Sequence, residues 1–479
     1  MIAAEPMPEL PTKRSCGMRQ SPRSASARLS MPEGATNPLT LENGSRVAVI
    51  GGGPAGSFFA YFLLRIARLV DVNLQVDIFE PRHFTHSGPA GCNHCGGIIS
   101  ESLVQLLATE GINLPPEVVQ RGIDSYRLHM DVGDVRIETP LHEKRIAAVY
   151  RGNGPRSSEP LRIVGFDRFL QEMARESGAN LYRQLVTKVD ISRGGVRVGC
   201  TDGRVRDYHL VALASGINSR LAEQITGVEA DHRLPKELTT FICEFRLGEA
   251  VVEKYFGSSM HVFLMDLPRL EFAALIPKGG FVTMCMLGKD VDRNLVETFL
   301  SSPEVRRCFP ESFVPDNVCH CFPRINVTAH TRPFGDRFVM VGDCGVTRLY
   351  KDGIGSAYRT AKVAATTAML QGIAADDFRR YFEPTCRTIN IDNAIGKAIF
   401  SCSHVFQKWR FSRRAILRMT AREQQGDPTA RHLSSILWDV FSGSAPYREV
   451  LARAFHPAFV AGMLGNLVAG NWPFARPST

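Results

Sequence analysis

The sequence predicts an α/β protein with an interleaved antiparallel sheet and a set of C-terminal helices. Three observations support this fold class. Near residue 50 and again near residue 340, a short apolar run leads into a glycine-rich loop and then a helical segment, which is typical of a parallel sheet. Residues 238–290 instead contain four β-like segments in succession. From residue 391 onward the pattern is helical and basic.

The composition is that of an ordinary globular chain. Of its 479 residues, 44% are hydrophobic and 22% are charged, and the net charge is +9. This length predicts two or three domains. The positive charge suits anionic lipid or an acidic protein partner, and because no nucleic-acid-binding motif accompanies it, we expect no nucleic-acid partner. Twelve cysteines without a recognisable secretory signal predict a reducing compartment and a cytoplasmic protein.

The N-terminal segment, residues 1–44, carries Pro, Ser, Arg and Gly without periodicity or an apolar run. This composition predicts a disordered basic tail. A translation start nearer Met31 and a transit peptide are the alternatives.

The strongest local signal begins at residue 46. Residues 47–50 predict a buried parallel strand, and Gly51, Gly53 and Gly56 then follow with G-x-G-x-x-G spacing ahead of an apolar helix over 57–70. Gly51 permits the tight turn, Gly53 lets a pyrophosphate approach the backbone, and Gly56 lets the helix pack on the strand. The helix N-terminus attracts phosphate.

A second apolar strand, residues 74–79, ends in Glu80. A carboxylate at this place accepts a hydrogen bond from a ribose hydroxyl. Together, the two strands, the glycine-rich turn, the helix between them and the final carboxylate predict a Rossmann-like dinucleotide-binding unit. We expect this unit to contact the cofactor through Gly51, Gly53, Pro54, Ala55, Gly56, Glu80 and Arg82.

A glycine-rich loop with two cysteines, Cys92 and Cys95, precedes a helix predicted over 98–107. The C-x-x-C spacing allows a metal site, for which Cys319 and Cys321 are a poorly spaced second pair. It also allows a redox dithiol. The interpretation that we favour is a loop that lays Cys95, Gly96 and Gly97 against a flat cofactor, with no metal.

A second glycine-rich loop follows a buried strand predicted over 337–341. Asp343 is placed to accept hydrogen bonds from a polyol such as ribitol, and Gly353 and Gly355 would bring bare backbone N–H groups beside a ring system. A helix is predicted over 356–371. The alternative is that Gly342-Asp343 forms a plain turn.

The rest of the chain gives the predicted domain plan. Residues 297–309 predict one helix, and 456–470 form an apolar run too short to span a bilayer. The C-terminal helices either cap the core or present an amphipathic surface to a membrane. The plan is a tail over 1–44, a discontinuous cofactor domain over 45–90, 160–230 and 330–390, a substrate domain over 91–159 and 231–329, and a helical region over 391–479.

The cofactor segments, in this order, resemble the geranylgeranyl reductase family of FAD flavoproteins, within the larger aromatic-hydroxylase-like group. The G-x-G-x-x-G unit with Glu80 matches the FAD fingerprint. Cys95-Gly96-Gly97 is similar to the family's Cys-Gly pair beside the isoalloxazine. Gly342 and Asp343, with Gly353, Ile354 and Gly355, are in register with the segment that contacts the ribityl chain and the flavin ring.

This resemblance implies an α/β fold in which a Rossmann-like FAD-binding domain is interleaved with an antiparallel-sheet substrate domain, followed by C-terminal helices. The family's lipid-cavity motif corresponds here to a segment whose candidate substrate-binding residues are Phe272, Ala274, Ile276 and Pro277. Two aromatic positions of that motif are smaller in this chain, which widens the predicted cavity. Tyr350 stands where the family's second loop usually has proline, and Lys351 and Asp352 follow it.

The resemblance implies an FAD-dependent reductase that saturates C=C bonds of a geranylgeranyl- or polyprenyl-type isoprenoid by hydride transfer. Cys95 and Tyr350 are the candidate proton donors, and ordered water is the alternative. The sequence has no second dinucleotide fingerprint, so NAD(P)H or reduced ferredoxin is expected to dock transiently. The alternative function is an FAD-dependent monooxygenase or halogenase acting on an aromatic or polyketide substrate. A quinone-linked dehydrogenase and a binding protein without turnover are less favoured.

Overall fold

The computed structural model describes residues 39–88, 95–138, 145–156, 163–217, 221–226, 235–314 and 317–471. The predicted tail over 1–38 lies outside the described residues. The described chain is structured before residue 45, however, because Leu41 is buried in the core and Leu39 accepts a hydrogen bond from the Ile373 N–H.

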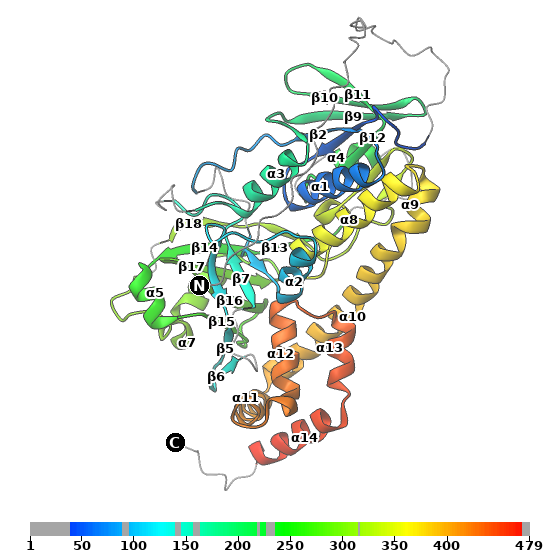
Figure 1. Ribbon diagram of the computed structural model, residues 1–479. Helices are drawn as coiled ribbons and strands as arrows, with labels where there is room; N and C mark the ends of the chain where they lie inside the picture. The colour runs from blue at the N-terminus through cyan, green and yellow to red at the C-terminus, as the bar shows by residue number, and fades with distance from the viewer. Residues whose placement is uncertain are drawn as a thin grey trace, which may run out of the picture. The chain divides into compact units, whose positions relative to one another are not determined.

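A six-stranded sheet with the order β20–β21–β12–β1–β2–β8 forms one half of the fold (Figure 1). Its neighbouring strands are parallel except for the β20–β21 pair. The strands come from three separate stretches of the chain. They are β1 (Arg46–Ile50), β2 (Gln75–Phe79), β8 (Asn180–Tyr182), β12 (Leu210–Leu213), β20 (Phe334–Gly335) and β21 (Phe338–Met340).

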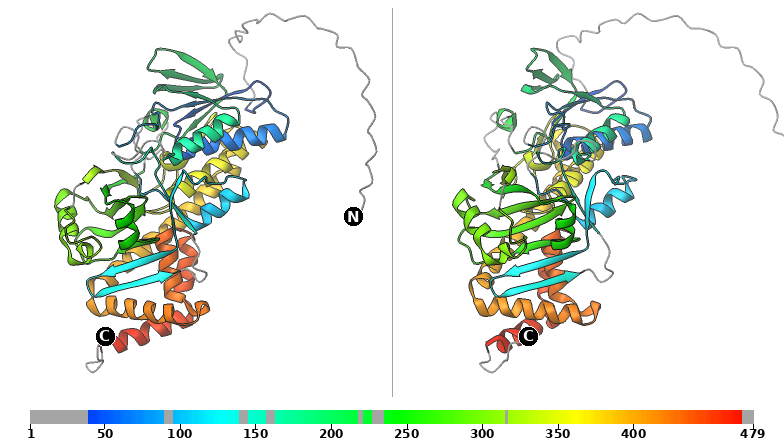
Figure 2. Two further views of the ribbon diagram at one scale, coloured as in Figure 1. Left: turned by 60° about the vertical axis from the view of Figure 1, so that its left-hand side comes forward. Right: turned by 90° about the vertical axis from the view of Figure 1, so that its left-hand side faces the viewer.

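Two different layers cover the faces of this sheet (Figure 2). Val47 and Val49 of β1 pack on the helical side, whereas Ala48 and Ile50 pack on the opposite side, as the two-residue period of a strand requires. The helices are α1 (Pro54–Leu69), α3 (Phe166–Glu176) and α8 (Gly353–Leu370). The opposite layer is a three-stranded sheet of β9 (Val186–Ser192), β10 (Gly195–Cys200) and β11 (Val205–Tyr208).

A seven-stranded sheet with the order β18–β14–β17–β16–β15–β5–β6 forms the other half. It is antiparallel except for the β15–β5 pair. Its strands are β5 (Ser125–Met130), β6 (Gly133–Glu138), β14 (Phe241–Arg246), β15 (Ser259–Phe263), β16 (Leu270–Lys278), β17 (Phe281–Gly288) and β18 (Asn317–Cys321). A small sheet of β3 (Ile98–Ile99), β7 (Ile146–Val149) and β4 (Val119–Ile123) lies beside it.

The helices around the second sheet fall into two groups. One face of the sheet packs against α5 (Glu249–Tyr255), α6 (Arg293–Ser301) and α7 (Pro303–Arg306). The other face packs partly against the C-terminal helices through Trp438 and Phe441. These helices are α10 (Glu383–Lys408), which runs down the right side of Figure 1, and, at the bottom, α11 (Arg410–Gln425), α12 (His432–Ser442), α13 (Tyr447–Ala454) and α14 (Pro457–Asn471).

Two predicted helices differ in the structure. The helix predicted over 98–107 is a strand followed by α2 (Glu101–Thr109), because Ile98 and Ile99 pair with β7 and the Ser100 hydroxyl caps the helix by accepting from the Leu103 N–H. The helix predicted over 297–309 is two helices, α6 and α7, separated at Ser302, which precedes Pro303.

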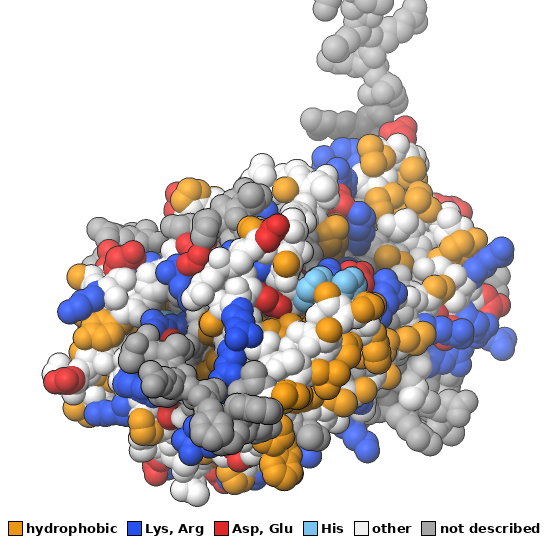
Figure 3. Space-filling view, turned by 90° about the horizontal axis from the view of Figure 1, so that it is seen from below, with side chains coloured by type: hydrophobic (Ala, Val, Ile, Leu, Met, Phe, Trp, Pro, Cys, Tyr) orange, Lys and Arg blue, Asp and Glu red, His pale blue; other side chains and the backbone are white. Residues whose placement is uncertain are grey.

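The apolar run near the C-terminus forms α14. Val460, Leu464 and Val468 of this helix are exposed by 40%, 58% and 63%. Figure 3, which views the molecule from below, shows hydrophobic side chains grouped on this face with Lys and Arg side chains beside them. Among the helices of the described chain, none has both the length and the hydropathy to cross a bilayer.

Candidate cofactor and substrate cavity

One large cavity, of about 820 Å³, lies where the two sheets meet. Its walls come from the β1–α1 loop, the end of β2, loop 95–97, strands β14, β16 and β17, and the loop before α8. Most of the predicted site residues line it: Gly51, Gly53, Pro54, Ala55, Glu80, Arg82, Cys95, Gly96, Gly97, Phe272, Ala274, Ile276, Asp343, Tyr350, Gly353 and Ile354.

The three glycines of the β1–α1 loop have different surroundings. A Cβ on Gly51 would lie 2.3 Å from the Ala214 carbonyl oxygen, and a Cβ on Gly56 would lie 1.9 Å from the Gly51 carbonyl oxygen. A Cβ on Gly53 would meet no atom nearer than Arg151 Nη2 at 3.4 Å. Gly51 and Gly56 are therefore required by the protein's own packing, whereas Gly53 leaves room that a ligand can fill.

Glu80 is held at the edge of the cavity by the backbone. Its Oε2 accepts from the Gly52 N–H and its Oε1 accepts from the Arg82 N–H, both at 2.9 Å. Each carboxylate oxygen keeps a lone pair for a ribose hydroxyl. The open space beside Gly53, called the glycine cradle below, lies at the N-terminus of the 16-residue helix α1. Together with Glu80, it fits the dinucleotide part of FAD.

An arginine that sequence analysis missed lies beside this cradle. Arg151 lines the cavity and donates to both carboxylate oxygens of fully buried Asp167, at 2.9 and 2.8 Å. This bidentate pair fixes a cation next to Gly53. No local motif marks it, because Arg151 follows β7 and Asp167 lies in the first turn of α3.

Loop 95–97 is pressed against β7. Gly97 has a φ of +68°, and its carbonyl oxygen accepts from the Val149 N–H at 2.7 Å. A Cβ on Gly97 would lie 1.9 Å from the Val149 carbonyl oxygen. Cys95 Sγ accepts from the Gly97 N–H at 3.4 Å. Position 97 therefore requires glycine, and the loop holds Cys95 at the cavity wall.

The C-x-x-C interpretations depend on Cys92, which lies outside the described residues. Within the part of the chain that the structure describes, Cys95 belongs to no group of three or more His, Cys, Asp and Glu side chains spaced to hold an ion. Cys319 and Cys321 lie on β18.

Lys278 is a second residue that the motifs did not identify. It is fully buried at the end of β16, with its ammonium 4.7 Å from the centroid of the Tyr150 ring. Lys278 Nζ has no hydrogen-bond partner among the described residues, and it lies 3.1 Å from the position that a Cβ on Gly97 would take. A buried cation therefore stands directly behind the loop predicted to meet the flavin.

The second cofactor loop brings three titratable groups to the cavity. The side chain of Asp343 is exposed to the interior of the cavity, and desolvation by the surrounding walls raises the pKa of its carboxyl. Burial, with a smaller contribution from Glu271, raises the pKa of Tyr350 to about 12. Burial lowers the pKa of Lys351 to about 7, and its ammonium lies 3.9 Å from the centroid of the Phe272 ring. Between Tyr350 and Lys351, Lys351 therefore has the pKa better suited to donating a proton near neutral pH.

The backbone of this loop is unusual. Tyr350 and Asp352 both have positive φ angles, +60° and +56°. For residues other than glycine this conformation costs free energy, so surrounding contacts must hold it.

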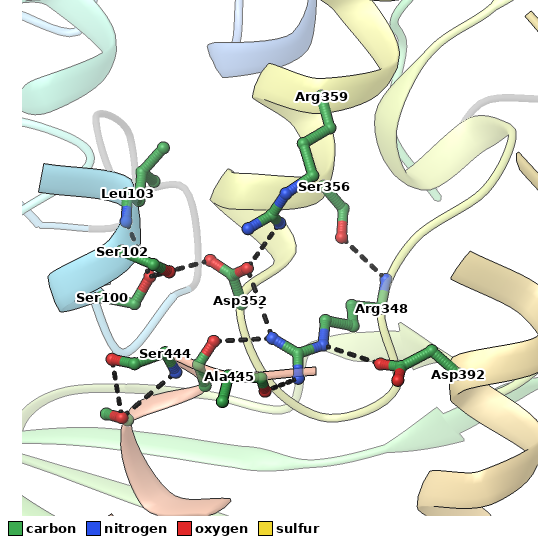
Figure 4. A network of polar contacts seen from close by, with 12 residues as sticks. Ser100, Ser102, Leu103, Arg348, Asp352, Ser356, Arg359, Asp392, Ser444 and Ala445 are labelled. Carbon is green, nitrogen blue, oxygen red and sulfur yellow. Dashed lines mark hydrogen bonds and ion pairs between the residues drawn. The ribbon is translucent and has the colours of Figure 1, made fainter. Parts of the chain in front are cut away.

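A network around Asp352 and Arg348 supplies those contacts (Figure 4). Asp352 accepts from Arg359 at 2.7 Å and from the Ser100 hydroxyl at 3.2 Å. Arg348 lies 3.5 Å from Asp352 and 3.4 Å from Asp392, and it donates to the carbonyl oxygens of Gly443 and Ala445. The loop is therefore tied to α2, α8, α10 and the α12–α13 connection.

The substrate side of the cavity is apolar. Phe272, Ala274 and Ile276 of β16 point into it, together with Met260, Leu287 and Phe441. Pro277, predicted as a substrate contact, is not in the wall. Side chains alternate along β16, and Pro277, whose strand partner is Val282, lies on the opposite face from Ile276.

Three predicted cofactor residues also lie behind the wall. They are Gly56, Gly342 and Gly355. A Cβ on Gly342 would lie 2.7 Å from Ala55 Cβ, and a Cβ on Gly355 would lie 2.1 Å from Asp352 Oδ1. These glycines allow close packing that shapes the cavity.

Comparison with known proteins gives curated relatives of two kinds, geranylgeranyl diphosphate reductases and FixC proteins. No family model matches the chain. A curated relative, a geranylgeranyl diphosphate reductase from Synechocystis, is 26% identical over 342 residues, which are 67% of this chain and 74% of the relative.

Solved structures share the fold. A geranylgeranyl bacteriochlorophyll reductase-like protein from Thermoplasma acidophilum aligns with a TM-score of 0.54 at 15% identity, covering 89% of this chain and all of that one. The halogenase PltM, solved as a mutant in complex with FAD, aligns with a TM-score of 0.56 at 13% identity, covering 89% of this chain and 91% of that one.

The fold, the glycine cradle with Glu80 and these relatives define the class: the chain is an FAD-dependent oxidoreductase. Within this class its sequence is similar to geranylgeranyl diphosphate reductases, in line with the resemblance of its sequence motifs.

Proposed function

We propose that this chain reduces carbon–carbon double bonds of an isoprenoid chain. The observation that carries the proposal is the apolar wall formed by Phe272, Ala274 and Ile276, which lines the same cavity as the predicted cofactor loops. Such a wall binds a hydrocarbon chain by removing apolar surface from water. The Synechocystis relative is named for the reduction of geranylgeranyl diphosphate.

Reduced FAD, when bound, supplies the hydride. The residues of the chain then have two tasks. An isolated double bond offers no polar handle, so the apolar wall must position it and exclude water. A proton must also reach the second carbon, and Lys351 is the donor that the cavity favours, because its lowered pKa of about 7 makes it a better acid at neutral pH than Tyr350.

The electron donor is part of the proposal. Either NAD(P)H enters the same cavity or a reduced ferredoxin docks on the basic surface. Rapid reduction of the bound flavin by NADPH alone would contradict the ferredoxin version.

The proposal also includes contact between the apolar face of α14 and a membrane in which a prenyl lipid resides. Wild-type protein should float with anionic vesicles, and Leu464→Asp should reduce the bound fraction. Equal flotation of both proteins would contradict this contact.

The function is tested by mass spectrometry of the product. FAD-loaded protein is incubated without oxygen with dithionite and geranylgeranyl diphosphate in deuterated water. Each reduced double bond should add two deuterium atoms, because dithionite supplies only electrons and both the transferred hydride and the proton then originate from the deuterated solvent. An unchanged prenyl compound, together with substrate-dependent oxygen consumption on an aromatic compound, would instead support a monooxygenase or halogenase.

A further inference from the structure

Three metal-ligating side chains converge on the face of the seven-stranded sheet that looks away from the cavity. They are His129 of β5, His261 of β15 and Cys308, which follows α7. Their exposed fractions are 7%, 3% and 4%. Met260 and Val262, which flank His261, pack on the opposite face of the sheet, and Met260 lines the cavity. The cluster is therefore separate from the flavin site.

The distances within the cluster match a shared ion. His129 Nε2 lies 3.1 Å from His261 Nδ1, His261 Nδ1 lies 3.4 Å from Cys308 Sγ, and Cys308 Sγ lies 3.8 Å from His129 Nε2. Tetrahedral zinc with ordinary bond lengths separates two nitrogens by about 3.3 Å and a nitrogen from a sulfur by about 3.6 Å. The three ligand atoms thus form a triangle of the right size without rearrangement.

The rings are held in place by packing. Phe263 stacks on His129 with centroids 4.7 Å apart and planes inclined by 14°, and Phe256 packs against His261 at 4.8 Å. Parallel pairing of β5 and β15 places His129 opposite Phe263 and His261 opposite Arg127, so the two imidazoles are diagonal neighbours on one face. The site is therefore preorganised by the register of the sheet.

We infer that His129, His261 and Cys308 bind a zinc ion. Two imidazoles and a thiolate suit zinc, which is borderline soft and accepts both ligand types. The fourth position opens on a polar cavity of about 320 Å³ whose wall includes Glu304, one turn before Cys308. Either water or the Glu304 carboxylate completes the tetrahedron.

The ion ties β5 and β15, which pair as neighbouring strands, to the segment after α7; without it, that segment packs with β15 in one apolar cluster that includes Phe263 and Phe309. A bound metal stabilises the state that binds it, so we expect zinc to raise the melting temperature of the folded protein.

The experiment uses FAD-loaded full-length protein, stripped with a chelator, incubated with zinc, freed of loose metal by gel filtration and analysed for zinc. We expect about one zinc per wild-type chain, and a loss of affinity of at least ~10-fold in Cys308→Ser and in His129→Asn. Cys386→Ser is the matched control, since Cys386 is a buried thiol outside the cluster; it should retain zinc. Retained FAD shows that each variant is folded.

Cobalt gives a second test that needs no variant to fold. Wild-type protein loaded with Co²⁺ should show a thiolate-to-cobalt charge-transfer band and the strong visible bands of tetrahedral cobalt. The inference would be overturned if the wild-type chain keeps no zinc, or if Cys308→Ser retains as much zinc as wild type. It would also be overturned if cobalt binds without a thiolate-to-cobalt band.

Discussion

The two walls of the cavity are built in different ways. The dinucleotide wall is made by backbone: glycines, a helix N-terminus and Glu80 held by the N–H groups of Gly52 and Arg82. The opposite wall is made by side chains from segments far apart in the sequence, with Lys351 and Phe272 in contact and Arg348 bracing the loop behind them. A wall built by backbone tolerates few changes at its glycines, whereas a wall built by side chains can change its chemistry residue by residue.

The largest effect should come from Arg348, which holds the loop before α8 in place. Arg348→Met should lower the free energy of unfolding by about 3 kcal/mol, because it leaves the buried carboxylate of Asp392 without its cation and the carbonyl oxygens of Gly443 and Ala445 without their donor. Asp352 keeps its pair with Arg359. Arg387→Met is the control: its ion pair with Glu383 is exposed, so its removal should cost less than about 1 kcal/mol. Urea unfolding of both variants measures the difference. Equal stability losses would contradict a bracing role for Arg348.

The next effect concerns chemistry at the side-chain wall. Lys351→Met should lower kcat about 100-fold or more at pH 7 while FAD content is unchanged, because it removes the proposed proton donor. The exposed Lys397 provides the control, and Lys397→Met should leave kcat unchanged.

The pH dependence sharpens this prediction. Burial lowers the pKa of Lys351 to about 7, so the fraction of wild-type protein with a charged ammonium, and with it kcat, should fall as pH rises through 7. The unfolded chain keeps this proton up to the ordinary pKa of 10.5. Stability should therefore rise with pH between about 7 and 10.5, since the unfolded state binds more protons there. A wild-type pH profile that Lys351→Met leaves unchanged would contradict the assignment.

A smaller effect should come from the backbone wall. Gly53→Ala should weaken FAD binding by about 10-fold or more with little loss of stability, because its Cβ has space within the protein but occupies the approach of the pyrophosphate. Gly194→Ala, in the β9–β10 turn where a Cβ meets nothing nearer than 3.9 Å, is the control. Titration of the FAD-free proteins with FAD measures both affinities, and equal affinities would show that Gly53 is not the cradle.

The smallest effect is expected at Cys95. Cys95→Ala should change kcat less than about 3-fold if Lys351 donates the proton, since the loop is positioned by the Gly97–Val149 backbone hydrogen bond. Single-turnover product formation measures this. A loss of 100-fold would transfer the proton donor's role to the thiol.

How far each wall could be predicted from the sequence depends on whether its residues lie close together in the chain. The β1–α1 unit could be predicted because turn, cradle and acid are local in sequence, and the observed β1, α1 and β2 occupy that segment. Arg151 and Asp167 meet only through the packing of α3, and His129 and His261 meet through strand register, so no local pattern identified either pair. Pro277 was misplaced because a motif match does not state which face of β16 a side chain occupies.

The most direct test of the proposed function is reoxidation of the reduced protein without oxygen. FAD-loaded protein is bleached with dithionite, freed of excess reductant and mixed with geranylgeranyl diphosphate, while the oxidised flavin absorption is followed. We expect that absorption to return on the timescale of turnover, and to return about 100-fold more slowly in Lys351→Met. The proposed reduction of isoprenoids would be contradicted if prenyl compounds do not reoxidise the reduced flavin, and if it reoxidises only with oxygen in the presence of an aromatic substrate.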